Sequence, residues 1–394
     1  MQVISKEPFF KAPGPRMLCW ASSFYTGGRG VGKMAYRSIM TRSDIWDSWE
    51  RSFSSDNGRT WSPWEQLTCN FTTSRGVRRQ ILRPGLVDVD RDRLIDVIIE
   101  GVLPNDTPLD GMQHYFLRYR VSVDGGRSAV VDRQIVQRGN YSPDHPFYGV
   151  WVGKNAISDP QRPIRTRAGR ILVPVEITPV GPDGEYCNPG GGYTYQDAAV
   201  LIGSWTDGVT IDWELSERVV SDPDLTSRGF FEGTIAELLD GRILMILRGS
   251  NQRRPDRPGY KWYAVSADGG YHWSRPEPWT YDDGSHFYSP SSMSQLIQHS
   301  NGRLYWIGNI VQENPSGNSP RYPLQAGLVD STQLTLFRDS VEVIDDRGRD
   351  DDPTLQLSNF YVDEDRENGD ILIHLSRFNV TEWSGDALLY RVAP

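Results

Sequence analysis

Residues 240–248 read DGRILMILR, a tight turn of small and charged residues followed by an apolar run. A short apolar run bounded by a turn is typical of a buried β-strand. Five further stretches have the same form, and they begin at Gly14, Arg91, Ala168, Asn301 and Asn368. The third residues of the six stretches lie 61 to 77 residues apart. Repetition at this period indicates repeated units with room for about four strands each, which predicts a β-propeller of six blades.

The composition points to the same fold class. The 394 residues include 38 Gly, 26 Pro and 13 Trp, and aromatic residues make up 11% of the chain. Many short strands, tight turns and flat aromatic surfaces go with such a composition, whereas a helical protein is richer in Ala, Leu and Lys. We therefore predict an all-β fold in which each blade is a four-stranded antiparallel sheet.

The two ends of the chain predict how the propeller closes. Only one clear strand, DALLYRV at 386–392, follows the last repeat, so the last blade lacks its outermost strand. The N-terminal stretch QVISKEPFF at 2–10 can supply this strand and remove a sheet edge. The length would suit two average domains, but repeated all-β folds run this long as one body. We expect a single domain over residues 1–394.

Charge and cysteine content exclude several classes of function. The formal net charge is -9, with 42 Lys and Arg against 51 Asp and Glu, which argues against a nucleic-acid partner because phosphate neutralisation needs a basic surface. The three cysteines, Cys19, Cys69 and Cys187, have neither metal-ligand nor disulfide-framework spacing. The acidic run DDDP at 350–353 lacks the pattern of a calcium loop. We expect no metal and no cofactor.

The sequence also bears on location. No apolar run is long enough to span a membrane, which predicts a soluble chain without a membrane partner. The N-terminal residues lack the charged, apolar and small-residue regions of a signal peptide. We expect a cytoplasmic protein by default, or a secreted or periplasmic one if a signal has been removed. The oligomeric state is open.

A second motif lies between strands. SSDNGRTW begins at Ser54, SADGGYHW begins at Ser266, and a weaker copy, SVDGGRSA, begins at Ser122. The Asp and Gly residues suit a left-handed, self-bonded turn between two strands, and the Trp suits a plug between sheets. The spacing resembles the Asp-box of the sialidase (BNR-repeat) superfamily of six-bladed propellers. This resemblance covers nearly the whole chain as a fold.

Polar residues occupy positions where the innermost strands should be apolar. The stretches that precede the repeats read SDPQRPI at 158–164, FFEGTIAEL at 230–238, FYSPSSMSQL at 287–296 and DDDPTLQL at 350–357. The inner strands of a propeller converge on one axis, and the loops that enter them form the mouth where ligands bind. Glu232 should therefore enter the mouth on one strand, and Arg248 should return to it on the next.

This stretch resembles the sialidase element in which a glutamate polarises the catalytic tyrosine and an arginine sixteen residues later binds the carboxylate of sialic acid. Glu232 and Arg248 fall at these places. Arg321 falls where another arginine of the carboxylate-binding triad is found. Bidentate guanidinium contacts suit a planar carboxylate.

Other parts of the sialidase pattern differ. Nothing matches the Phe/Tyr-Arg-Ile-Pro stretch that supplies the first arginine, which leaves Arg37 or the pair Arg78 and Arg79 as unaligned substitutes. An aspartate, Asp351 or Asp352, stands where the catalytic tyrosine is expected. The acid/base aspartate falls at Asp44 or Asp47, and Asp44 is preferred because it lies further from the strand.

These residues predict an exo-acting glycoside hydrolase of the sialidase-like superfamily, acting on an oligosaccharide or polysaccharide with a terminal sugar that is acidic, sialic-acid-like or uronic. Without the tyrosine, carboxylates have to supply the acid and the base or nucleophile. The expected catalytic residues are Glu232, Asp44, Asp159, Asp351, Asp352 and Tyr288, and the expected substrate-binding residues are Arg248, Arg321, Arg162 and His286.

Alternatives stay open for the function and for single residues. A polysaccharide lyase acting on uronic-acid polymers would use His286 and Tyr288 to move a proton. A non-catalytic glycan-binding propeller and an exo-hydrolase of neutral sugars, as in the arabinan-cleaving propellers, are further hypotheses. Glu232 and Arg248 could equally form a structural ion pair. Trp46, Trp49 and Trp151 are candidates for a glycan platform or for packing between blades.

Overall fold

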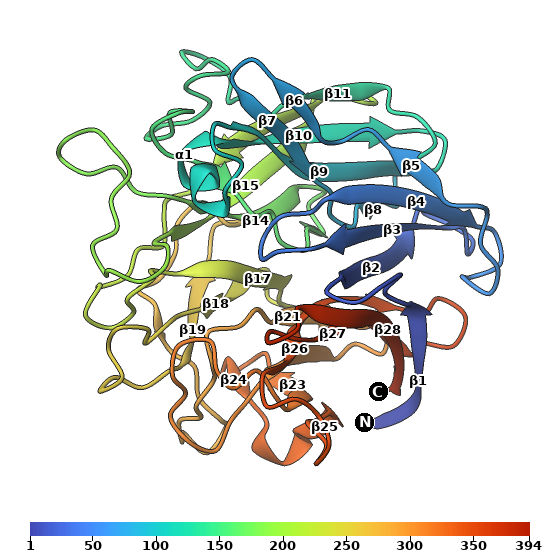
Figure 1. Cartoon of the computed structure of the whole chain (residues 1–394), viewed down its shortest axis with the longest axis vertical. Coiled ribbons are helices and arrows are strands. Elements are labelled where there is room, and N and C mark those ends of the chain that lie inside the picture. Colours follow the sequence, from blue (N-terminus) through green and yellow to red (C-terminus); the bar gives the residue numbers. More distant parts are fainter. The chain divides into compact units, whose positions relative to one another are not determined.

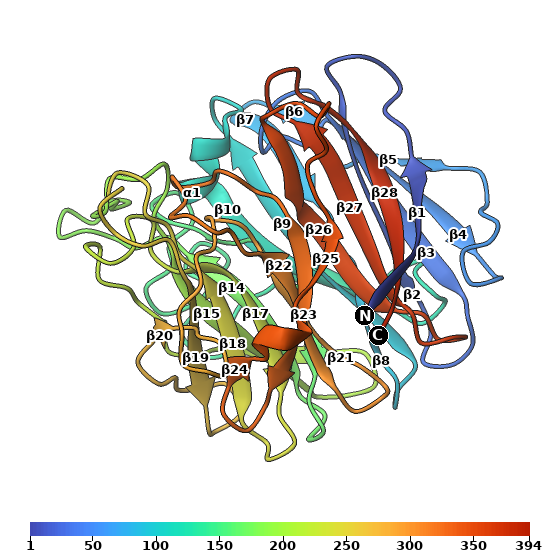
Figure 2. The same cartoon turned by 90° about the horizontal axis from the view of Figure 1, so that it is seen from below.

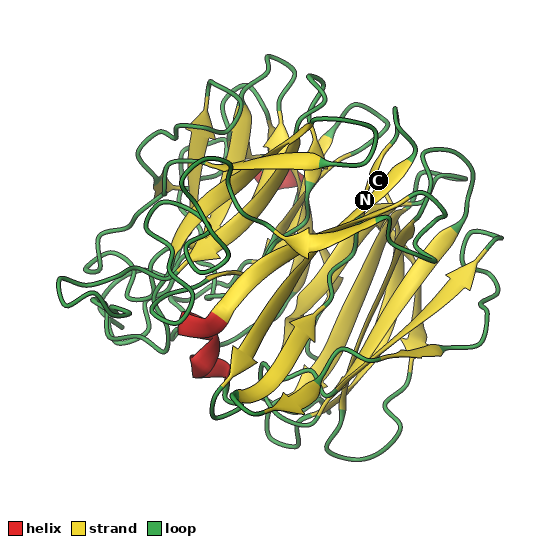
Figure 3. Cartoon of the chain, turned by 90° about the horizontal axis from the view of Figure 1, so that it is seen from above, coloured by secondary structure: helices red, strands yellow, loops and turns green.

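The computed structural model describes residues 1–394 and consists almost wholly of β-strands (Figure 1). The helical segments are short and comprise η1 (Pro108–Asp110), α1 (Gly111–His114) and η2 (Arg338–Ser340). The cartoon coloured by secondary structure shows the same predominance of strand (Figure 3). The prediction of an all-β fold is confirmed. No helix is both long and apolar enough to cross a lipid bilayer.

The chain divides into two compact units. Unit 1 comprises Met1–Ser22, Pro189–Tyr193 and Val219–Pro394, and unit 2 comprises Ser23–Asn188 and Thr194–Arg218. The division falls inside strand β2 (Leu18–Tyr25). The single domain expected over residues 1–394 stays a prediction.

Unit 2 contains three groups of antiparallel strands. The first group begins with β2 and continues with β3, β4 and β5 in sequence order, the second has the order β11-β10-β9-β7-β6 with β8 beside β9, and the third has the order β12-β14-β15-β16 with β13 beside β14. The strand bounds are β3 (Lys33–Met40), β4 (Ser48–Ser54), β5 (Glu65–Leu67), β6 (Phe71–Thr73), β7 (Gly76–Ile81), β8 (Leu86–Asp88), β9 (Arg93–Leu103), β10 (Tyr115–Ser122), β11 (Val131–Gln134), β12 (Ile157–Ser158), β13 (Ile164–Arg165), β14 (Ile171–Ile177), β15 (Asp197–Trp205) and β16 (Ile211–Leu215).

Unit 1 also contains three groups. They have the orders β17-β18-β19-β20, β21-β22-β23-β24 with β25 beside β23, and β26-β27-β28 with β1 beside β28. Within unit 1, Leu18 of β2 also pairs in parallel with Gly385 of β28. The strand bounds are β1 (Gln2–Phe10), β17 (Phe231–Glu237), β18 (Ile243–Arg248), β19 (Lys261–Ser266), β20 (Glu277–Pro278), β21 (Gln295–Gln298), β22 (Leu304–Asn309), β23 (Leu324–Asp330), β24 (Thr335–Leu336), β25 (Glu342–Asp345), β26 (Leu355–Glu364), β27 (Ile371–Asn379) and β28 (Ser384–Ala393).

The N-terminal strand lies beside the last C-terminal strand. β1 pairs antiparallel with β28, from Gln2 opposite Ala393 to Phe10 opposite Ala387. The two chain ends accordingly lie next to each other in both views (Figures 1 and 2). This is the strand partner that the sequence predicted for residues 2–10. The number of blades and the closure of the propeller stay predictions.

The repeated turn–strand stretches occupy the same place in five groups. They lead into β9, β14, β18, β22 and β27, each of which follows another strand of its own group. The stretch from Gly14 differs because it leads into β2, the first strand of its group. The expectation that an inner strand precedes every repeat is therefore wrong for this stretch. The first and the second strand of a group can both consist of a turn followed by an apolar run, so this local pattern does not show which of the two a stretch forms.

Fully buried tryptophans pack between the strand groups of unit 1. Trp279 and Trp306 have ring centroids 5.6 Å apart and lie in one apolar cluster with residues of β17, β18 and β22. A second cluster joins β22 and β23 to β26 and β27. In contrast, Trp61 and Trp273, which end the two near-intact turn motifs, are only half-buried. The Trp61 indole donates to the carbonyl of Gly58 in its own turn, so it braces the turn instead of plugging two sheets.

The three turn motifs share one hydrogen-bond pattern. The Ser266 hydroxyl donates to Asp268 Oδ1 and accepts from the amides of Asp268 and Gly270. Asp268 in turn accepts from the amide of His272. Gly270 has a φ of 99°, which a side chain would oppose. The same serine and aspartate bonds recur in the turns that begin at Ser54 and Ser122.

The buried hydroxyl of Ser266 therefore makes a testable contribution to stability. We expect Ser266→Ala to lower the free energy of unfolding by about 1–3 kcal/mol, because two backbone amides lose their acceptor. Urea unfolding followed by circular dichroism measures the change. Ser300→Ala, at an exposed serine, is the control and should leave stability within about 0.5 kcal/mol of the wild type. If Ser266→Ala had the same free energy of unfolding as Ser300→Ala, the Ser266 hydroxyl would not contribute to stability.

Candidate active site

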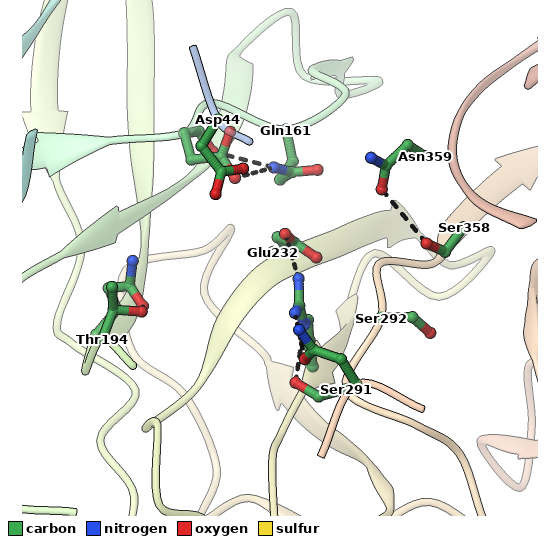
Figure 4. Close-up of polar contacts among 12 residues, drawn as sticks. Asp44, Gln161, Thr194, Glu232, Ser291, Ser292, Ser358 and Asn359 are labelled. Carbon is green, nitrogen blue, oxygen red and sulfur yellow. Dashed lines mark hydrogen bonds and ion pairs between the residues drawn. The ribbon is translucent and has the colours of Figure 1, made fainter. Parts of the chain in front are cut away.

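Glu232 lies at an irregular point near the start of β17. The antiparallel register with β18 places Phe231 opposite Arg248 and then shifts before Thr234. Glu232 has a φ of 44°, a left-handed conformation that is uncommon outside Gly and Asn and is usually imposed by its surroundings. A bulge of this kind redirects a side chain. The Glu232 carboxylate accepts a hydrogen bond of 2.5 Å from Arg248 Nη1, so the two predicted residues meet (Figure 4).

Every nitrogen of the Arg248 guanidinium has an acceptor. Besides the bond to Glu232, Nε donates to the Ser291 hydroxyl at 3.0 Å and Nη2 donates to Asn318 Oδ1 at 3.3 Å. The guanidinium carbon lies 4.3 Å from the centroid of the Phe231 ring. The Arg248 side chain is 7% exposed and that of Glu232 is 19% exposed. The arginine is therefore fixed beneath the carboxylate, which is the more accessible partner.

Two further cations bind to residues 291–292, the segment that holds Arg248. Arg321 donates to the Ser291 carbonyl from Nε at 3.2 Å and from Nη2 at 2.9 Å. Lys261, at the start of β19 and opposite Arg248 in the strand register, donates from Nζ to the Ser292 carbonyl. Residues 291–292 thus bind three basic side chains through one hydroxyl and two carbonyls.

The cluster carries more positive than negative charge. Burial favours the neutral form of Glu232, but the neighbouring Arg248, followed by Arg321 and Lys261, lowers its pKa below the usual value. Burial lowers the pKa of Lys261 to about 7, Arg248 and Arg321 act in the same direction, and Glu232 opposes them. Glu232 is therefore ionised at neutral pH. Two buried basic residues, Arg248 and Lys261, and the half-buried Arg321 around one carboxylate are suited to attract a further anion.

Two asparagines, the buried Asn251 and the exposed Asn314, hold the loop that contributes Asn318 and Arg321. Asn251 donates to the Pro315 carbonyl and accepts from the amide of Gly317. Asn314 accepts from the amide of Gly259 and donates to the Arg257 carbonyl. On the other side, the Arg321 carbonyl accepts from the amide of Leu357 in β26. These bonds fix the position of the loop from both ends.

Asp351 and Asp352 have local partners. Arg377 donates to both carboxylate oxygens of Asp351, and Asp352 accepts from the amide and hydroxyl of Thr354. These hydrogen bonds lower the pKa of both aspartates. The structure therefore gives each a loop-bracing role, and neither has the raised pKa of a proton donor. The role predicted for them in place of the tyrosine stays a prediction.

His286 and Tyr288 belong to a stack of three rings. The Tyr260 ring lies 5.1 Å from that of His286 and 6.0 Å from that of Tyr288, at interplanar angles of 20° and 12°. No hydrogen bond joins His286 to Tyr288. Tyr260 directly precedes Lys261, and Tyr288 lies three residues before Ser291, so this stack is close in sequence to the cation cluster.

The predicted residues of unit 2 form their own polar groups. Asp159 has a φ of 46°, forms an ion pair with Arg83 and accepts from Gln161 Nε2 at 2.9 Å (Figure 4). Arg162 is half-buried, and its Nε has no hydrogen-bond partner. Asp44 is exposed, has a φ of 56° and accepts from the Ser43 hydroxyl.

The other residues of unit 2 that the sequence offered for the site make hydrogen bonds or ion pairs with neighbouring residues. Asp47 accepts from the amide and the hydroxyl of Thr41, so it braces its loop. The substitutes for the missing first arginine form ion pairs within the unit, and these are Arg37 with Glu50, Arg78 with Glu100 and Arg79 with Asp106. No group of three His, Cys, Asp or Glu side chains is placed to hold a metal ion.

Sequence reasoning missed Lys261, Ser291 and Asn318. Lys261 opens the run KWYAVS, which reads as an ordinary strand with a solvated first residue. Ser291 lies in a stretch whose polar residues were noted, but its partners come from β18 and from the 310–323 loop. Asn318 lies in a loop without a pattern of its own. The position of each depends on contacts between residues distant in sequence.

The buried Lys261 predicts how stability depends on pH. Its pKa falls from about 10.5 in the unfolded chain to about 7 in the folded one, so between these values only the unfolded chain holds the proton. Stability should rise with pH across this window, by up to about 1.4 kcal/mol per pH unit from this group. In Lys261→Met the rise should be flatter. Urea unfolding at pH 6.5, 8 and 9.5 tests this, with the exposed Lys11→Met as control; parallel pH curves for wild type and Lys261→Met would contradict it.

Comparisons with known proteins identify fold neighbours only. Neither a protein-family model nor the sequence of a curated protein matches the chain. Among solved structures, a protein of unknown function from Dyadobacter fermentans is 14% identical with a TM-score of 0.62, covering 99% of this chain and 98% of that chain. The K499G mutant of the NanB sialidase from Streptococcus pneumoniae is 11% identical with a TM-score of 0.62, covering 98% of this chain and 70% of that chain.

A third neighbour acts on a different sugar. The GH93 α-L-arabinofuranosidase of Fusarium graminearum, in complex with arabinobiose, is 10% identical with a TM-score of 0.57, and 99% of this chain and 98% of that chain are covered. At these identities the likeness concerns the fold. The chain is thus all-β and similar in fold to sialidase and arabinofuranosidase propellers.

Proposed function

We propose that the protein is an exo-acting glycoside hydrolase of the sialidase-like superfamily that removes a terminal acidic sugar from a glycan. The observation that carries this proposal is the cluster of Arg248, Arg321 and Lys261 around Glu232. A carboxylate on the sugar would add the second negative charge that this group of cations favours. A guanidinium also matches the plane of a carboxylate. The sialic-acid-like or uronic identity of the sugar belongs to the proposal.

Glu232 takes the role of base or nucleophile. Arg248 keeps it ionised, and an ionised carboxylate can activate water or attack the anomeric carbon, whereas it cannot donate a proton. Its greater exposure relative to Arg248 supports this role, because a substrate would reach the carboxylate before the guanidinium. Arg248 positions Glu232 and contributes charge.

The general acid has to be another group. Asp351 and Asp352 have lowered pKa values, which disfavours a proton-donor role for either. We propose Asp44 for this role on the resemblance to the acid/base aspartate of sialidases; its side chain is exposed, so a glycan can reach it, and it accepts from the adjacent Ser43 hydroxyl. Asp159, which forms an ion pair with Arg83, is the second candidate.

The same proposal includes the finer description of the fold. We infer that the six strand groups are six blades, that β1 serves as the outermost strand of the last blade, and that the three serine–aspartate turns are Asp-boxes. The shared hydrogen bonds of these turns and the pairing of β1 with β28 support it.

A non-catalytic glycan-binding propeller is the second candidate function. The absence of a raised-pKa carboxyl beside Glu232 supports it, since binding an acidic sugar needs the cations but no proton donor. A lyase has less support, because His286 and Tyr288 each stack on Tyr260 and no hydrogen bond joins them.

Product analysis with a Glu232→Gln variant tests the proposal. We expect the wild type to release a terminal acidic sugar from reporter glycosides and acidic glycans, with kcat falling at least a hundredfold in Glu232→Gln because the amide cannot act as base or nucleophile. Mass spectrometry identifies the sugar, and absorbance of an unsaturated uronate reveals a lyase. Glu237→Gln, on the same strand, is the matched control and should keep wild-type activity.

The choice of leaving group separates the catalytic roles. A nitrophenyl glycoside needs little protonation, so a variant of the general acid should keep most of its activity on this substrate and lose it on a natural glycan. Asp44→Asn should show this difference, while Glu232→Gln should lose activity on both. Binding of acidic sugars that is retained in Glu232→Gln, without product from the wild type on any substrate, would overturn the hydrolase in favour of the binding protein.

A further inference from the structure

The loop of residues 141–155 in unit 2 carries aromatic side chains on its surface. Within eleven residues it holds Tyr141, His145, Tyr148 and Trp151. Tyr148 is 82% exposed and Trp151 is 37% exposed. Scattered exposed apolar residues are ordinary, but several aromatic rings gathered on one exposed loop mark a binding surface. We call residues 141–155 the aromatic loop.

The aromatic loop has a fixed backbone. Ser142 and His145 exchange two backbone hydrogen bonds, and the amide of Val150 donates to the carbonyl of Phe147. Phe147 and Val150 are fully buried and flank Tyr148 in this second turn. The exposed ring of Tyr148 is therefore carried at the tip of an anchored turn. A contact surface on a fixed backbone loses little conformational entropy when it binds a ligand.

One buried side chain holds the loop near Trp151. Asn155 accepts from the amide of Trp151 at 2.7 Å and donates to the carbonyls of Gly149 and Thr178 at 2.9 and 2.7 Å. Arg218 Nη2 also donates to the Gly149 carbonyl, at 2.8 Å. Satisfying a fully buried amide in this way fixes the backbone on both sides of Trp151.

The Trp151 ring has one face covered by another ring. His145 lies parallel to it, with the centroids 4.8 Å apart and an interplanar angle of 4°, and Tyr141 meets His145 edge-on at 5.3 Å. The stack therefore supports the indole from one side. An indole that is backed on one face and partly exposed elsewhere is suited to contact the apolar C–H face of a sugar ring.

The other two tryptophans that the sequence offered for a glycan platform differ in this respect. Trp49 is fully buried, and Trp46 stacks on it with centroids 6.5 Å apart. These two rings belong to the packing of unit 2. Of the three candidates, Trp151 is the exposed one.

The polar surroundings favour an uncharged ligand. The exposed side chains of the loop include Ser142, Asp144 and Lys154, which supply a hydroxyl, a carboxylate and an ammonium group. The charges of Asp144 and Lys154 have opposite signs, in contrast to the excess of cations around Glu232. Such a mixture can donate to and accept from sugar hydroxyls without selecting for an anion.

We propose that the aromatic loop is a binding site for neutral glycans, in which Trp151 stacks on one sugar ring and Tyr148 provides a second contact. The choice of a glycan as the ligand rests on the proposed function. A protein that removes a terminal acidic sugar benefits from a second site that binds the neutral part of the same glycan. The site is non-catalytic and makes no use of the Glu232 cluster.

Binding of neutral oligosaccharides tests this site. The probes are neutral hexasaccharides of glucose, mannose, galactose, xylose and arabinose, titrated calorimetrically into full-length Glu232→Gln, which prevents turnover. We expect at least one probe to bind, with an affinity that falls at least tenfold in Trp151→Ala and several-fold in Tyr148→Ala. Phe71→Ala, at an aromatic residue of unit 2 that is 46% exposed, is the control and should bind as the parent does.

The outcomes separate this inference from the proposed hydrolase. Wild-type binding in a folded Trp151→Ala variant, or no binding of any probe by the parent, would overturn the site. Folding is checked by thermal unfolding, and Trp151→Phe, which keeps a ring, should retain part of the affinity. Activity of Trp151→Ala on a small reporter glycoside should equal that of the wild type. If the protein had no hydrolase activity but still bound a neutral probe through Trp151, the proposed hydrolase function would be contradicted and the glycan-binding site would be supported.

Discussion

The burial of the Arg248 guanidinium is the constraint on which the rest of the candidate site depends. Removing a charged group from water costs several kcal/mol unless the protein supplies a partner and hydrogen-bond acceptors. Glu232, Ser291 and Asn318 supply them, and the Phe231 ring lies against the guanidinium. Three separate parts of unit 1 must therefore take fixed positions before this arginine can be buried. That requirement ties β17, the turn at residue 291 and the 310–323 loop to one geometry.

The number of cations around Glu232 distinguishes its ion pair with Arg248 from a purely structural one. A structural pair needs one cation for one carboxylate, whereas Glu232 has Arg248, Arg321 and Lys261 around it. Burial first, and then the two arginines, disfavour the charged form of Lys261, as its lowered pKa indicates. Strain of this sort is common where a protein is organised for a ligand that is charged in the opposite sense. The left-handed backbone of Glu232 is a second local cost at the same place.

The sequence predicted the fold better than it predicted the site, for a physical reason. A strand that is buried on both faces must be an apolar run, and a tight turn must be rich in Gly and Asp, so the repeats could be read locally. The stretch at Gly14 misled because first and second strands meet the same requirement. Glu232 and Arg248 were found because they lie at the two ends of one hairpin. Lys261 and Ser291 were missed because their roles come from contacts across separate strand groups. The charge run at Asp351 did not indicate that Arg377 would donate hydrogen bonds to this aspartate.

The ionisation of Glu232 also limits which chemistry the cluster can perform. A glycosidase needs a carboxyl that stays protonated until the leaving group departs, and burial or a neighbouring carboxylate is what normally keeps it so. In this cluster the cations act in the opposite direction on Glu232, and local hydrogen bonds do the same for Asp351 and Asp352. In the proposed hydrolase the two halves of the catalytic task would therefore be divided, because the cation-rich cluster favours an ionised carboxylate and disfavours a proton donor. Under the proposed function, the proton would come from a carboxyl outside the influence of these three cations.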